Sequence, residues 1–113
     1  MCSLSILDII VRNIVEAAKK SLGNKLDKVI LYGSYARGDY NSESDIDIMV
    51  LADVSAEDME RIENDLWHIG WDLGFKHDVV VTVFLKDRDT FYRFLPAEPF
   101  YQNIIRDGVL LSA

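Results

Sequence analysis

Apolar residues recur along this chain at two spacings, one helical and one extended. Intervals of three and four residues predict long amphipathic helices over residues 5–22 and 55–73. Trp67 and Trp71 lie four residues apart in the second of these segments, and we expect them to widen its buried stripe. Two shorter helices are expected near the C-terminus, one on each side of Pro96.

Three short apolar segments between the predicted helices have the composition of strands. They cover residues 28–32, 44–51 and 79–85. The β-branched density of the last segment predicts a central strand, and residues 109–111 are expected to dock as a tail. Because these segments alternate with helices, the chain is predicted to form a small α/β (α+β) layer with about three core strands.

The length and composition predict one globular domain. The chain has 113 residues, the size of a single domain over 1–113, and 50% of them are apolar. Its apolar runs fall short of the roughly 20 residues of a membrane span, and no secretory signal is apparent, so we expect a cytoplasmic protein without a membrane partner. Cys2 is the only cysteine, which excludes an internal disulfide and a site of paired thiolates.

The charge balance restricts the partners further. There are 12 basic and 19 acidic residues, which give a net charge of −7. An excess of acid disfavours tight binding to long nucleic acid, since that binding is driven by phosphate neutralisation. We therefore expect any anionic substrate to be held locally, by backbone N–H groups, a few arginines and metal ions.

The chemistry of the chain is concentrated in residues 28–51. Asp45 and Asp47 alternate along a predicted strand, so both carboxylates project from the same side, about 6.6 Å apart. Carboxylates at this spacing can hold two hard cations that activate an attacking oxygen and neutralise a leaving pyrophosphate. Two aspartates alone are more often solvated charges, so the assignment depends on what precedes them.

A glycine–serine turn precedes the two aspartates. Gly33 lets the backbone approach a phosphate closely, Ser34 offers a hydroxyl and the start of a short helix, and Arg37 brings a permanent cation. Gly38 then allows the chain to reverse. These residue types in this order predict a cradle for the phosphates of a nucleotide beside the metal site.

A third carboxylate is expected from another part of the chain. Asp78 is the best placed by sequence, because it enters a strand that we expect to lie beside the first aspartate pair. Asp53 competes for this role but lies beyond the far end of its strand, and Asp72 is interpreted as a solvated charge on a helix.

These residues carry a family resemblance. Gly33 and Ser34, followed after ten residues by Asp45-x-Asp47, resemble the nucleotidyltransferase signature of the DNA polymerase beta superfamily. Two further features are similar to its minimal nucleotidyltransferase branch: the Ala36-Arg37-Gly38 run and Ser44 before the aspartates. The tail over residues 100–109 also resembles that branch, so the resemblance covers essentially the whole chain.

The resemblance implies a fold, a reaction and a partner. The fold is a small mixed sheet flanked by helices, the cofactor is Mg²⁺ as two ions, and the donor is a nucleoside triphosphate, usually ATP. By resemblance, Gly33 and Ser34 bind the triphosphate, with Arg37 and Ser44 beside them. Asp45 and Asp47 bind metal, and Asp78 matches the third acid.

The minimal branch resembles the antitoxins of HEPN toxin–antitoxin pairs, which are associated with transferring AMP to a tyrosine of the HEPN ribonuclease. We therefore expect a HEPN-type protein as partner, and the oligomeric state stays open. Two alternatives remain at this point. One is a non-catalytic antitoxin that sequesters its toxin, and the other is an enzyme that transfers a nucleotide to a small molecule such as an antibiotic.

Overall fold

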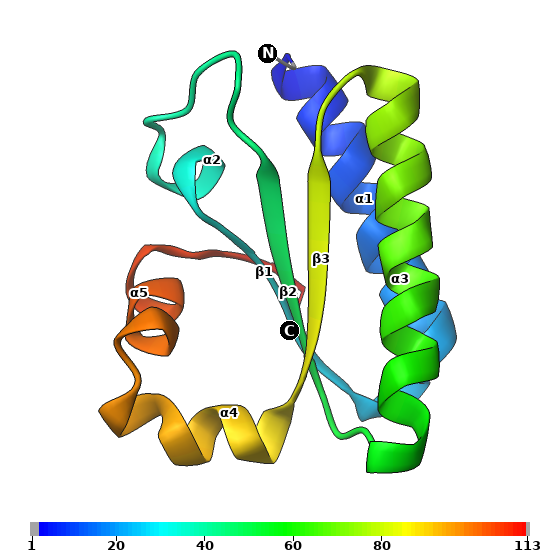
Figure 1. Cartoon of the computed structure of the whole chain (residues 1–113), viewed down its shortest axis with the longest axis vertical. Coiled ribbons are helices and arrows are strands. Elements are labelled where there is room, and N and C mark those ends of the chain that lie inside the picture. Colours follow the sequence, from blue (N-terminus) through cyan, green and yellow to red (C-terminus); the bar gives the residue numbers. More distant parts are fainter. Residues whose placement is uncertain (1–2, 113) are drawn as a thin grey trace.

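A computed structural model describes residues 3–112 of the chain, so Cys2 lies outside the described residues. The strands and helices follow the predicted order, with 3-10 turns at Gly23–Lys25 and Leu95–Ala97 (Figure 1). The elements are α1 (Leu4–Leu22), β1 (Leu26–Tyr32), α2 (Ser34–Arg37), β2 (Ile46–Ala52), α3 (Ala56–His77), β3 (Val81–Asp87), α4 (Arg88–Phe94), α5 (Pro99–Asp107) and β4 (Val109–Ser112).

The strands form one mixed sheet in the order β3-β2-β1-β4. β1 pairs antiparallel with both β2 and β4, and β2 pairs parallel with β3. Over the described residues the sheet contains the three predicted strands and a fourth, β4, because the tail that was expected only to dock pairs with β1. β3 is an edge strand and not the predicted central one, since a run of β-branched residues reports a buried face and not a position in the sheet.

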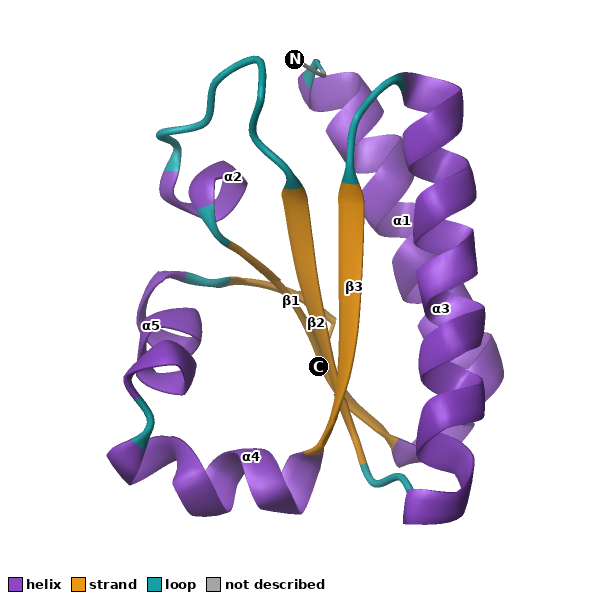
Figure 2. Ribbon diagram, viewed as in Figure 1, coloured by secondary structure: helices purple, strands orange, loops and turns teal. Residues whose placement is uncertain are grey.

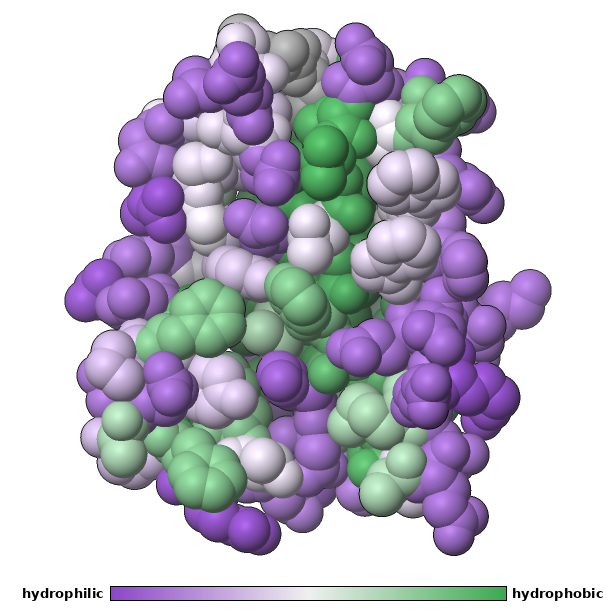
Figure 3. Space-filling view, in the orientation of Figure 1, coloured by the Kyte–Doolittle hydropathy of each residue, from purple (hydrophilic) through white to green (hydrophobic). Residues whose placement is uncertain are grey.

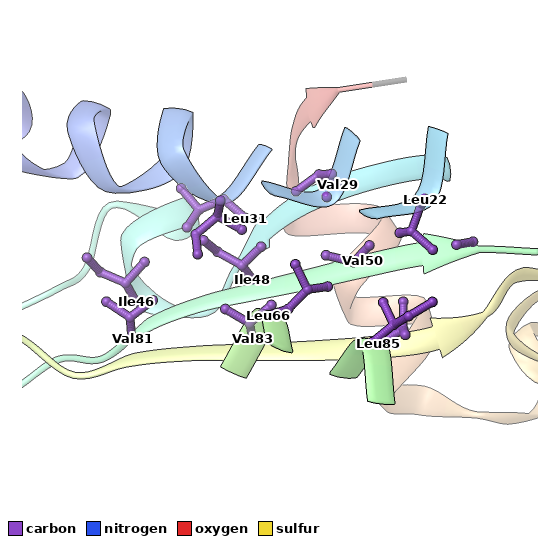
Figure 4. Packing of buried hydrophobic residues seen from close by; sticks show 14 of the residues in the cluster. Leu22, Val29, Leu31, Ile46, Ile48, Val50, Leu66, Val81, Val83 and Leu85 are labelled. Atoms are coloured by element: carbon purple, nitrogen blue, oxygen red, sulfur yellow. The ribbon is translucent and has the colours of Figure 1, made fainter. Parts of the chain in front are cut away.

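Helices cover both faces of the sheet. α1 and α3 pack on one face, while α4 and α5 lie against the other (Figure 2). The larger core fills the α1/α3 side, and Figure 4 shows its strand residues interdigitating with Leu22 and Leu66 from the helices. The smaller core contains Met49 and Leu51 of β2 with Phe91 and Ile104 of the covering helices. The mixed sheet flanked by helices is therefore confirmed.

Two glycines let α3 lie close to β3. A Cβ built on Gly70 would come within 3.0 Å of Cγ2 of Val83, and one on Gly74 would collide with the carbonyl oxygen of Val79. Gly70 is thus a point of close contact between helix and sheet. Trp67 and Trp71 do not widen the buried stripe as predicted, because their side chains are 44% and 57% exposed.

Across the described residues, the helices are either too short or too polar to span a bilayer. This agrees with the expectation drawn from the length of the apolar runs.

Phe91 anchors α4 to the sheet and is fully buried. Phe91→Ala is expected to lower the free energy of unfolding by about 3 to 5 kcal/mol, because it removes the ring and leaves a cavity. Phe94→Ala, on the same helix but 52% exposed, is the matched control and should change it by less than about 0.5 kcal/mol. Urea unfolding monitored by circular dichroism measures both values, and equal losses in the two variants would contradict this packing.

Candidate functional site

The predicted site residues gather at one end of the sheet, where β1 finishes and β2 and β3 begin. The antiparallel register places Tyr32 of β1 beside Asp47 of β2, and the parallel register places Thr82 of β3 on the other side of Asp47. The turn of helix α2 and the loop of residues 38–45 follow β1 and lie above this end of the sheet (Figure 1).

Asp47 lies on β2 as the alternation predicted, whereas Asp45 lies just before the strand begins. Ile46, Ile48 and Val50 face the α1/α3 core, so Asp47 projects from the opposite face with Met49 and Leu51. Asp47 is half-buried, whereas Asp45, just before the strand, is exposed. The pair therefore has one carboxylate set into the sheet and one at its end.

The electrostatics of the pair favour a bound cation. The pKa of Asp47 is raised to about 6, mainly by burial and also by the charge of Asp45, while the Arg37 guanidinium opposes the shift. Burial also raises the pKa of Tyr32, with the charge of Asp47 as a second cause. Two close carboxylates and one exposed guanidinium leave uncompensated negative charge here, and oxygen donors of this kind suit Mg²⁺, which keeps most of its shell as water and phosphate.

Gly33 is held directly against Asp47. Its φ of 76° lies in the left-handed region, and a Cβ built on it would overlap Oδ2 of Asp47. Only glycine can therefore occupy this position without moving the carboxylate. The Gly33 carbonyl accepts hydrogen bonds from the amides of Ala36 and Arg37, at 3.1 Å each, which fixes the turn into α2.

One cavity, of about 380 Å³, lies between α2, β2 and α5. Gly33, Ser34, Arg37 and Asp47 all line it, so the structure brings the phosphate cradle and one aspartate together as predicted. Gly33 is the N-cap of α2, and Ser34 is its first residue and not its cap. Arg37 forms an ion pair with Asp39, with its Nε 3.2 Å from Oδ2.

A second cavity, of about 360 Å³, lies on the other side of the aspartates. Asp45, Ser44 and Asp78 line it together with residues of α3 and the start of β3. The Ser44 hydroxyl accepts a hydrogen bond of 2.9 Å from the amide of Asn41, which closes the loop before the aspartates. Ser44 therefore stabilises the conformation of this loop.

The structure places Asp78 at the mouth of the site and outside the strand. It ends α3 in a left-handed conformation with φ of 55°, three residues before β3 begins. The strand positions that face the same way as Asp47 hold Val80 and Thr82 instead. Asp53 follows β2 at the opposite end of the sheet, where its amide bonds to the Lys25 carbonyl. Among the described residues, no three His, Cys, Asp or Glu side chains are grouped to hold a metal, and Asp78 as third acid stays a prediction.

The sequence interpretation assigned no chemistry to α5, which forms one wall of the first cavity. Phe100, Asn103 and Asp107 of this helix line it opposite the glycine–serine turn. The charge of Arg37 also contributes to the lowered pKa of Asp107, after the larger effect of its hydrogen bond from Arg106. The spacing of Asn103 and Asp107, four residues apart, is the available signal in the sequence that they share a helix face.

The comparison with known families decides the identity of this arrangement. The family model described as "Nucleotidyltransferase domain" matches residues 11–109, from within α1 to the start of β4. The chain belongs to the nucleotidyltransferase family. The resemblance drawn from the glycine–serine turn and the aspartate pair is thereby confirmed at the level of the family, and the protein is an enzyme of the nucleotidyltransferase type.

Two curated relatives of this nucleotidyltransferase come from Methanocaldococcus jannaschii. "Putative protein adenylyltransferase MJ0604" is 31% identical over 101 residues, which is 89% of this chain and 93% of the relative. "Putative protein adenylyltransferase MJ0141" is 67% identical over a local stretch of 30 residues, 26% of this chain and 30% of the relative.

Solved structures share the fold of this nucleotidyltransferase. One described as "Crystal structure of the toxin-antitoxin with AMP-PNP" has a TM-score of 0.57 at 22% identity, covering 91% of this chain and 73% of that chain. A mutant of the toxin–antitoxin MntA-HpeT has the same TM-score of 0.57 at 20% identity, again covering 91% and 73%. At these identities the likeness concerns the fold.

The half-buried carboxylate of Asp47 leads to a prediction about how stability depends on pH. The raised pKa of Asp47 means that the native state binds its proton more tightly than the unfolded state, so ionisation between about pH 4 and pH 6 destabilises the fold. Asp47→Asn should therefore be more stable than the natural protein above pH 6, by about 1 kcal/mol once solvent screening is allowed for. The two proteins should be equally stable near pH 4.

Urea unfolding in EDTA at several pH values measures this difference. Asp72→Asn, at an exposed position of α3, is the control and should follow the natural protein at every pH. A difference between the natural protein and Asp47→Asn that stays constant with pH would contradict the burial of the charge.

Proposed function

We propose that this enzyme is a Mg²⁺-dependent protein adenylyltransferase that transfers AMP from ATP to a hydroxyl group of a HEPN-type partner protein, and thereby acts as an antitoxin. The observation that carries the proposal is the contact of Gly33 with Asp47, because it places the glycine–serine turn and one carboxylate of the pair in the same cavity. The relatives named as protein adenylyltransferases and the toxin–antitoxin structures of the same fold support it.

Residues on the two sides of the aspartates would have different roles in the reaction. Gly33, Ser34 and Arg37 would hold the β- and γ-phosphates of ATP in the first cavity, which places the α-phosphorus near Asp45 and Asp47. The acceptor oxygen forms a bond to this phosphorus as the bond to the pyrophosphate oxygen breaks. The hydroxyl proton passes to a carboxylate or to water. The Arg37 guanidinium would neutralise part of the negative charge of the leaving pyrophosphate.

Asp45 and Asp47 would hold the metal, with Asp78 proposed as the third acid on the side of Asp45. When bound, Mg²⁺ would neutralise the developing negative charge and lower the pKa of the attacking hydroxyl. Because a cation also offsets the repulsion between the two carboxylates, its binding would favour the ionised form of Asp47. The half-buried position keeps this carboxylate oriented toward the cavity.

Asp47→Asn and Asp45→Asn are each expected to lower transfer by at least about a hundredfold while leaving the protein folded, because one metal-holding carboxylate is lost. The measurement is incorporation of label from α-labelled ATP into a HEPN-type partner with Mg²⁺, analysed after denaturing electrophoresis. Asp72→Asn is the matched control and should transfer at the natural rate.

The same assay separates the alternatives. Labelled partner with the natural enzyme, and none with either variant, supports the proposal. Transfer undiminished in Asp47→Asn contradicts the assigned site. Inhibition of the toxin that survives in both variants, without label, identifies simple sequestration, and label in a small product without any partner protein identifies a small-molecule transferase.

Gly33→Ala gives an independent test of the contact with Asp47. It is expected to reduce transfer by at least about tenfold, since the added Cβ must displace the carboxylate. Gly23→Ala is the control: Gly23 has φ of 57°, so it carries a similar backbone cost of about 1 kcal/mol, but nothing lies within 4 Å of an added Cβ. Equal transfer rates in the two variants would show that the contact does not matter to the reaction.

A further inference from the structure

The second cavity differs in chemistry from the first. Asp45 and Asp78 form its polar side, whereas Trp71, Phe75 and Val80 form its apolar side. The first cavity, in contrast, is lined by the glycine–serine turn and Arg37. The aspartate pair separates the two, with Asp47 facing the first and Asp45 the second.

The apolar side of the second cavity is exposed to an unusual degree. Phe75 is 84% exposed, and Trp71 and Val80 are more than half exposed. Trp67 continues the row along α3, with its ring stacked on that of Trp71 at 5.6 Å. Figure 3 shows weakly polar and apolar side chains gathered along β3 and the neighbouring side of α3, with charged side chains around them. Exposed apolar surface of this kind marks a place where another molecule binds.

The direction of the reaction assigns the occupant of this surface. In phosphoryl transfer the attacking and leaving oxygens lie roughly in line, on opposite sides of the phosphorus. If the pyrophosphate leaves toward Gly33 and Arg37, the acceptor oxygen must arrive from the other side of the aspartates. That side is the second cavity, which is lined by Asp45 together with the aromatic side chains of Trp71 and Phe75.

We propose that the second cavity is the acceptor subsite and receives an aromatic, hydroxyl-bearing side chain of the partner protein. This proposal rests on the proposed function and adds the location and the residues of recognition. The ring of the acceptor packs against Trp71 and Phe75, and its hydroxyl group reaches Asp45. Glu43 also lines the cavity beside Asp45 and Asp78, so its acidic rim favours a basic segment of the partner around the acceptor side chain.

The nucleobase is assigned to the first cavity for the same geometric reason. Its far wall on α5 carries the Asn103 amide, which can donate to and accept from a base, and the ring of Phe100. Gly33, Ser34 and Arg37, which would hold the triphosphate, line this same cavity, whereas Ser44 lines the second. This leaves the aromatic side chains of α3 to the acceptor.

Trp71→Ala combined with Phe75→Ala tests the assignment through two separate constants. We expect the KM for the HEPN-type partner to rise by at least about tenfold, while the affinity for AMP-PNP with Mg²⁺, measured by calorimetry, stays within about twofold of the natural value. Phe94→Ala removes an aromatic ring of similar exposure on α4 and is the control; it should leave both constants unchanged. Trp71→Phe alone should retain most of the affinity for the partner, because it keeps a ring at the entrance.

Each other result has a defined meaning. Loss of affinity for AMP-PNP with an unchanged KM for the partner would assign the aromatic residues to the nucleobase and overturn the proposal. Unchanged values of both constants would show that the surface is unused, and conversion of a dimer to a monomer by the double variant would assign it to a second copy of the chain. Absence of transfer by the natural enzyme would instead refute the proposed function itself, and the acceptor subsite with it.

Discussion

The site depends on the contact between the backbone of Gly33 and the carboxylate of Asp47. A half-buried carboxylate beside a second negative charge is unfavourable, and the raised pKa of Asp47 records that cost. The fold maintains it because β1 and β2 pair in a fixed register, which sets Asp47 beside Tyr32 and directly below the turn. The proposed bound cation would offset this repulsion between the two carboxylates.

The antiparallel and parallel pairings of β2 give the two sides of the site their different chemistry. On the side of β1 the chain turns back at once into α2, which brings backbone and arginine groups suited to phosphate. On the side of β3, α3 approaches the sheet closely at Gly70 and carries the exposed side chains of Trp67 and Trp71. Trp71 lines the second cavity together with Asp45.

Local patterns predicted much of this arrangement. The alternation through Asp45 and Asp47 determines which face they share, and Gly33 with Ser34 determines where the turn lies, because both effects act within a few residues. The sequence did not show which strands pair with one another. The β-branched run of β3 looked central because periodicity reports burial of side chains and not the number of neighbouring strands. Residues 109–112 pair with β1, which is distant in sequence.

Local sequence patterns also failed to predict two other features. These are the exposure of the α3 aromatic side chains and the contribution of α5 to the first cavity. Trp67 and Trp71 have the spacing of core residues, yet both side chains are exposed. Asn103 and Asp107 lie on a helix that reaches the site from the other end of the chain. Such long-range placement is set by tertiary packing, which local propensity does not encode.

The most direct test of the account is a crystal structure of the enzyme with Mn²⁺ and AMP-PNP, with the metal located by anomalous scattering. The account predicts metal between the carboxylates of Asp45 and Asp47, and β- and γ-phosphates against Gly33, Ser34 and Arg37. A triphosphate bound on the side of Trp71, or metal bound away from both aspartates, would contradict it.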